Sequence, residues 1–69
     1  MSISGYFKAA IENYFKAEKK TPKVKAEAKE LINQFQISEK YEEFEDIEEY
    51  KIIKVQIKQI YDEVYNNKW

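Results

Sequence analysis

Apolar residues in the first half of the chain recur at intervals of three and four positions, which is the spacing of an amphipathic helix. Two helices are predicted, at about residues 5–20 and 22–36. Thr21 and Pro22 mark the boundary, because threonine caps a helix start, proline suits the first helical turn, and the residue before a proline resists the helical conformation. The residues expected to face the core are Ile3, Phe7, Ala10, Ile11, Tyr14 and Phe15 in the first helix and Val24, Ala28, Leu31, Ile32 and Phe35 in the second.

The segment from about 39 to 66 is helical in composition, but its apolar face changes direction part of the way along. At about 100° per residue, Tyr41, Phe44, Ile52 and Val55 fall on one side of an unbroken helix. A second apolar set falls on nearly the opposite side, and one helix cannot bury both sides against the same core. This second set consists of Tyr50, Ile53, Ile57, Ile60, Tyr61 and Val64.

Three interpretations of the third segment are open. The helix can break near Asp46, which has the form of a capping box with Glu49, leaving a short helix at about 39–45 and a long one at about 47–66. A single long helix can instead carry a second apolar patch for a partner. A strand around 53–57 would match the alternation of apolar and polar residues there, but no second segment is available to pair with it. The break is favoured, and the predicted fold class is all-α: a small three-helix bundle, or four helices if the third segment breaks near Asp46.

The composition limits the chemistry that the chain can perform. Sixty-nine residues suffice for a single domain over residues 1–69, and a domain of this size buries only about 60% of its unfolded surface. The absence of cysteine and histidine excludes disulfides and ordinary zinc or iron sites, so neither a metal nor a cofactor is expected. Ser2, Ser4 and Ser38 stand at predicted helix starts, where capping is a simpler role than catalysis. The sequence therefore predicts a protein that is not an enzyme.

Acidic residues are concentrated at the start of the third segment. Residues 39–49 contain seven acids against Lys40, a balance of −6 in a chain whose net charge is −1. On a continuous helix their spacing would form an anionic face that imitates a row of phosphates and attracts a basic partner. The alternative is a solvated face that favours the N-terminus of a helix.

A lysine cluster lies at the predicted junction of the first two helices. It could follow a nucleic-acid backbone. However, Glu18, Glu27 and Glu30 interrupt it, and the chain has no arginine, the usual residue for bidentate phosphate or base contacts. Binding of nucleic acid through this region is therefore the weaker alternative. The cluster consists of Lys16, Lys19, Lys20, Lys23, Lys25 and Lys29.

Aromatic residues are frequent, with six tyrosines, four phenylalanines and one tryptophan. The phenylalanines are expected in the core. Tyrosine and tryptophan combine apolar area with a polar tip and are enriched at protein interfaces, so several of them are candidates for a contact surface. The core set is Phe7, Phe15, Phe35 and Phe44, and the contact set is Tyr41, Tyr50, Tyr61, Tyr65 and Trp69.

These patterns predict a small module that binds another protein, as an inhibitor, antitoxin, immunity factor or regulator does. A homodimer is the alternative, with Ile52 and Val55 buried against a second copy. No signal peptide and no apolar run of about 20 residues is visible, which predicts a cytoplasmic protein that does not cross a membrane. In size and composition the chain resembles accessory proteins of phages, plasmids and bacterial defence loci. The predicted protein-binding residues are Tyr41, Glu42, Glu43, Phe44, Asp46, Glu49, Ile52 and Val55.

Overall fold

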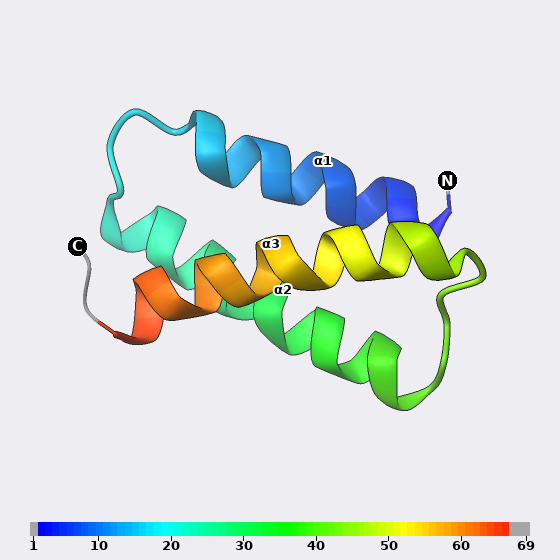
Figure 1. Ribbon diagram of the computed structural model, residues 1–69. Coiled ribbons are helices and arrows are strands. Elements are labelled where there is room, and N and C mark those ends of the chain that lie inside the picture. The colour runs from blue at the N-terminus through cyan, green and yellow to red at the C-terminus, as the bar shows by residue number, and fades with distance from the viewer. Residues whose placement is uncertain (1, 67–69) are drawn as a thin grey trace.

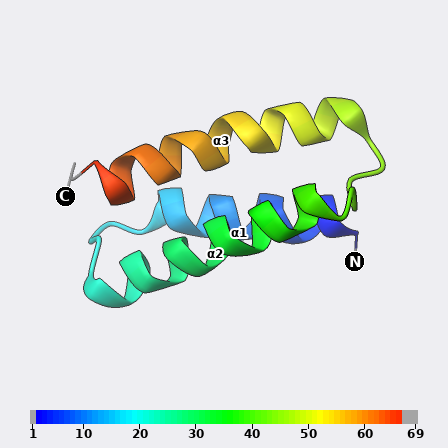
Figure 2. The same ribbon diagram turned by 90° about the horizontal axis from the view of Figure 1, so that it is seen from below.

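Three helices form an up-down-up bundle in the computed structural model, which describes residues 2–66 (Figure 1). Helix α1 spans Ile3–Lys16, α2 spans Pro22–Lys40 and α3 spans Ile47–Tyr65. Helices α1 and α2 lie side by side, and α3 packs across both of them (Figure 2). The predicted all-α three-helix bundle is confirmed, and the alternating residues 53–57 lie inside α3 instead of in a strand.

Helix α1 ends at Lys16, earlier than the predicted end near Lys20. Tyr14 is the last buried residue of α1, so a longer helix would gain no further packing against the core. The side chain of Lys20 turns back instead, and its Nζ atom donates to the backbone carbonyls of Tyr14 (2.5 Å) and Ala17 (3.2 Å). An ammonium group near the C-terminus of a helix satisfies carbonyls that have no helical partner.

Helix α2 begins where predicted and ends later than predicted. The Thr21 Oγ1 atom accepts a hydrogen bond from the Val24 amide at 3.3 Å, and Pro22 occupies the first turn. The helix continues beyond residue 36 to Lys40, because Ser38 extends its buried face by one turn and is only 3% exposed. The predicted role of Ser38 as the cap of the third segment is therefore wrong.

A Schellman turn ends α2 and replaces the predicted short helix at 39–45. The Glu43 amide donates to the Ser38 carbonyl (3.0 Å) and the Glu42 amide to the Glu39 carbonyl (3.1 Å), which is the hydrogen-bond pattern of this motif. Glu42 takes a φ of 53°, in the left-handed region where glycine is normally found. The alternative of four helices is thus excluded, because residues 41–46 form a connection without a helix.

The predicted break near Asp46 is confirmed. An oxygen of its carboxylate accepts hydrogen bonds from the amides of Glu48 (2.9 Å) and Glu49 (3.2 Å) and caps the start of α3. Glu49 does not complete the capping box, because its carboxylate pairs with Lys8 of α1 at 2.7 Å. A single unbroken helix over 39–66 is therefore wrong.

The core lies where the three apolar stripes meet. Phe7, Ile53 and Ile60 are 0% exposed, whereas Phe15 is 41% exposed on the flank of α1 and does not join the core as predicted. None of the helices within residues 2–66 is long and apolar enough to span a bilayer. The buried apolar residues are Phe7, Ile11, Tyr14, Ala28, Leu31, Ile32, Phe35, Ile53, Ile57, Ile60 and Val64.

Four aromatic rings meet at the end of the bundle that carries the α2–α3 connection. Ring centroids of Phe7, Phe35 and Phe44 lie 5.5–5.7 Å apart in each pairing. The Tyr50 ring lies 5.1 Å from Phe44 and 6.1 Å from Phe35. This aromatic cluster joins all three helices to the connection through Phe44.

Replacing Ile53 by alanine should lower the free energy of unfolding by about 2–5 kcal/mol, because the fully buried side chain leaves a cavity. Its neighbour Ile52 is 56% exposed, so the same change there should shift stability by less than about 0.5 kcal/mol. Urea denaturation of both variants checks this, and equal losses at the two positions would contradict the described core.

Replacing Glu42 by glycine should raise the free energy of unfolding by about 0.5–1 kcal/mol, because glycine adopts positive φ without a clash of its Cβ atom. The matched control is Glu43→Gly, where φ is not positive. That change should lower stability by about 0.5–1 kcal/mol, since glycine loses more conformational freedom on folding. A loss of stability at both positions in urea denaturation would contradict the left-handed conformation of Glu42.

Candidate functional site

The strongest charge feature is an acidic end of the bundle, formed by the last turn of α2, the connection after it and the first turn of α3. Both views place this end beside the start of α1 and opposite the α1–α2 connection (Figures 1 and 2). The acidic end consists of Glu39, Glu42, Glu43, Glu45, Asp46, Glu48 and Glu49.

Three members of the acidic end are engaged within the molecule. Glu39 accepts a hydrogen bond from the Tyr50 hydroxyl at 2.5 Å and lies 3.5 Å from the Lys54 ammonium. Glu49 is paired with Lys8, and Asp46 caps α3. These contacts tie α3 to α2 and to α1, so these carboxylates have a structural role.

The other four carboxylates have no internal partner. Glu42, Glu43, Glu45 and Glu48 are exposed, and none of their side chains forms an ion pair or hydrogen bond within residues 2–66. Their negative charge is therefore open to solvent and close together along the chain. Like charges so arranged repel one another at short range, and a cationic partner would relieve that repulsion.

Apolar side chains are exposed beside these carboxylates. Tyr41 is 66% exposed, Ile47 60% and Ile37 40%. A cavity of about 250 Å³ lies at Ile47, and the rings of Phe44 and Tyr50 and the side chains of Glu39 and Glu42 complete its lining. The acidic end thus combines charge with apolar surface.

Lys54 stands at the edge of this cavity. Its Nζ atom lies 5.6 Å from the centroid of the Tyr50 ring, in addition to its contact with Glu39. The hydrogen bond and attraction to Tyr50, followed by the attraction to Glu39, raise the pKa of Lys54 above its ordinary value. The ammonium group thus lies close to both an aromatic ring and a carboxylate.

The structure divides the predicted protein-binding residues into two places. Tyr41, Glu42, Glu43, Phe44 and Asp46 lie together in the connection, next to Glu49. Phe44 is half-buried in the aromatic cluster, and Asp46 and Glu49 are engaged as described. Because the segment breaks, the acids do not form the continuous helical face that the spacing predicted. Ile52 and Val55 lie further along α3, away from the connection.

Two exposed isoleucines at the acidic end are absent from the predicted set. Ile37 falls outside the buried stripe of α2, and Ile47 outside that of α3. The signal that could have identified Ile47 is its place directly after Asp46, once Asp46 is read as the helix cap. Trp69, a predicted contact residue, lies outside the described residues. Tyr61 and Tyr65 are half-exposed, and their tilted rings have centroids 4.7 Å apart.

Ile52 contributes to a second surface, an open groove of about 490 Å³ between α1 and α3. Ile11 and Phe15 of α1 and Ile52 of α3 form its apolar part. Its charges are largely paired: Lys16 lies 2.6 Å from Glu12, whose pKa is lowered by the hydrogen bond and attraction to this lysine. Val55, 67% exposed, is one helical turn from Ile52.

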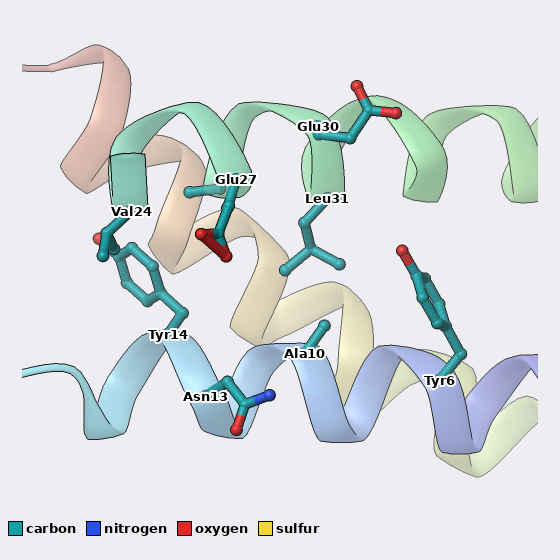
Figure 3. Close-up of a pocket in the computed structure, with 9 residues that line it drawn as sticks. Tyr6, Ala10, Asn13, Tyr14, Val24, Glu27, Glu30 and Leu31 are labelled. Carbon is teal, nitrogen blue, oxygen red and sulfur yellow. The ribbon is translucent and has the colours of Figure 1, made fainter. Parts of the chain in front are cut away.

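A third surface is the groove of about 290 Å³ between α1 and α2 (Figure 3). The rings of Tyr6 and Tyr14 stand at its two ends, with Ala10 between them, and Leu31 reaches down from α2. The Glu27 side chain points into the groove, whereas Glu30 points away from it (Figure 3). No lysine lines this groove among the described residues.

Several side chains of the lysine cluster are engaged in contacts within the molecule. Lys16 pairs with Glu12, and Lys20 bonds to the carbonyls at the end of α1. The Lys29 ammonium lies 5.6 Å from the ring centroid of Tyr65. Fewer lysines are therefore available to a polyanion than the sequence alone indicates.

Among residues 2–66, no group of three or more histidine, cysteine, aspartate and glutamate side chains has the arrangement needed to hold a metal ion. The arrangement that remains is a surface one: unpaired carboxylates beside exposed apolar side chains, with two apolar grooves elsewhere on the bundle. Comparisons of the chain with protein-family models, with curated proteins and with solved structures found no match.

Proposed function

We propose that the protein is a small non-enzymatic binding module whose acidic end docks on a basic surface of another protein. A module of this kind can act as an inhibitor, antitoxin, immunity factor or regulator. The observation that carries the proposal is the set of four unpaired carboxylates beside the exposed side chains of Tyr41 and Ile47.

The mixture of apolar and charged groups supports a protein as the partner. Protein interfaces place aromatic and aliphatic side chains at the centre of the contact and polar groups around it. Tyr41 and Ile47 can supply the centre, and the unpaired carboxylates can supply the rim. Charges on a rim contribute mainly to specificity and to the rate of association, so the affinity should depend on salt.

Nucleic-acid mimicry is one form of this proposal. Closely spaced carboxylates can occupy a groove in which a basic protein otherwise binds phosphates. Nucleic-acid mimicry requires in addition that duplex DNA compete with the protein for the captured partner. A partner that binds both at once would limit the proposal to ordinary docking.

Self-association is the second candidate, and the groove between α1 and α3 is the observation that favours it. Phe15 and Ile52 line this groove and are 41% and 56% exposed, and Val55, one helical turn from Ile52, is 67% exposed. A second copy could bury them, because a surface that repeats on two identical chains can close a two-fold dimer. Binding of nucleic acid through the lysine cluster has less support, since several of those lysines are engaged internally.

Neutralising the four unpaired acids as Glu42→Gln, Glu43→Gln, Glu45→Gln and Glu48→Gln should weaken the binding of a basic partner captured from the source cell. Each lost charge pair is worth about 0.2–1 kcal/mol, so the loss in affinity should lie between about 4-fold and 1,000-fold. Calorimetry with the captured partner at two salt concentrations measures it.

The matched control neutralises four acids outside the acidic end, as Glu18→Gln, Glu27→Gln, Glu30→Gln and Asp62→Asn. Both variants change the net charge equally, and urea denaturation verifies that both remain folded. The control should retain the partner. A partner that loses affinity equally with both variants responds to net charge alone and contradicts docking at the acidic end.

If the second candidate is correct, the sedimentation coefficient should rise with protein concentration, and Val55→Asp should prevent the rise by placing a charge in the apolar contact. Lys23→Asp, at an exposed position of α2 outside this groove, is the control and should leave self-association in place. A monomer at every concentration would exclude this candidate.

A further inference from the structure

The cavity at the acidic end combines aromatic rings with carboxylates, as the groove between α1 and α2 does, and it is the one that lies at the exposed acids. Its walls are the rings of Phe44 and Tyr50 and the side chain of Ile47, and its charged lining consists of Glu39 and Glu42. At about 250 Å³ it is smaller than the roughly 300–1,000 Å³ typical of pockets for drug-sized ligands. A single long side chain fits this size better than a free metabolite does.

A cation already occupies the edge of this cavity. The Lys54 ammonium lies 3.5 Å from the Glu39 carboxylate and 5.6 Å from the centroid of the Tyr50 ring. A positive charge is therefore stabilised here by a carboxylate and by an aromatic face together. The side chain of Lys54 is 57% exposed and is not part of the cavity lining, so it leaves the cavity itself open.

Glu42 brings a second carboxylate to the cavity, and nothing within residues 2–66 neutralises it. It belongs to the turn that ends α2, whereas Glu39 belongs to the last turn of that helix. Two carboxylates from successive turns, above an apolar wall, are complementary to a cationic group on an apolar stem.

We propose that this cavity receives an arginine side chain of the basic protein partner. The methylene groups of arginine would pack on Ile47, the flat guanidinium would stack on the ring of Tyr50 or Phe44, and its N–H groups would donate to Glu42 and Glu39. Arginine fits better than lysine, because its guanidinium is planar, more weakly hydrated and able to donate to two carboxylates. The inference rests on the proposed function and names the side chain that anchors the partner.

The test is a titration of the ¹⁵N-labelled protein, followed by NMR, with the peptide acetyl-Ala-Arg-Ala-Ala-Arg-Ala-Ala-Arg-amide at low salt. Two further peptides replace the arginines by lysine, which keeps the charge, and by citrulline, which keeps the shape without the charge. We expect shifts centred on the amides of Glu42, Phe44, Ile47 and Tyr50. The arginine peptide should bind about 3- to 10-fold more tightly than the lysine peptide, and the citrulline peptide should not bind.

Single variants separate the cavity from the general charge of the acidic end. Glu42→Gln should lower the affinity for the arginine peptide about 3- to 10-fold. Glu48→Gln, an equal change of charge outside the cavity, should lower that affinity less than 2-fold. Glu27→Gln removes the carboxylate that points into the groove between α1 and α2 and should have no effect. All three positions are exposed, so the fold should persist.

The outcomes distinguish the two proposals. Shifts spread over the acidic end, with equal effects of Glu42→Gln and Glu48→Gln, would overturn the arginine cavity and leave docking at the acidic end intact. Chemical-shift changes centred on Ala10 and Asn13 would show that the peptide binds in the groove between α1 and α2. That result would also overturn the arginine cavity. No shift at millimolar peptide would count against both proposals.

Discussion

The arrangement of the acidic end depends on the aromatic cluster of Phe7, Phe35, Phe44 and Tyr50. Its four rings come from α1, α2, the connection and α3, so a single group of contacts holds all four segments together. Edge-to-face and tilted ring pairs contribute about 0.5–1.5 kcal/mol each beyond the area that they bury. Phe44 matters most, because residues 43–46 have no regular secondary structure and this ring anchors them to the core.

The cluster also explains how so many carboxylates can be held near one another. Asp46, Glu48 and Glu49 lie where the dipole of α3 is positive, which favours them. Glu39 lies at the C-terminal end of α2, where the helix dipole disfavours a negative charge. The Tyr50 hydroxyl and Lys54 stabilise its carboxylate there. The remaining carboxylates have no such contact, and the packing of the aromatic rings against the core offsets their mutual repulsion.

The features that the sequence predicts correctly are those that depend on neighbouring residues. Thr21 with Pro22 and the cap at Asp46 are local signals, and the stripes of α1, α2 and α3 follow from helical periodicity. The sequence pattern predicts the end of α1 too late, because the Lys20 side chain folds back over the last carbonyls of the helix. The pattern predicts the end of α2 too early, because Glu42 occupies the left-handed position that ends the helix without being a glycine. The sequence predicts the candidate surface through its charge, but the separation of Ile52 from the connection emerges only from packing in three dimensions.

The distribution of charge along the bundle has a consequence for the way in which a partner would approach. The molecule measures 33 × 21 × 17 Å, with the acidic end at one extremity of the bundle and the lysine-rich α1–α2 connection at the other (Figure 1). Such an arrangement gives the protein a permanent electric dipole moment along its length. In the field of a basic surface the molecule would rotate before it touches, so that a larger fraction of collisions begins with the acidic end facing forward.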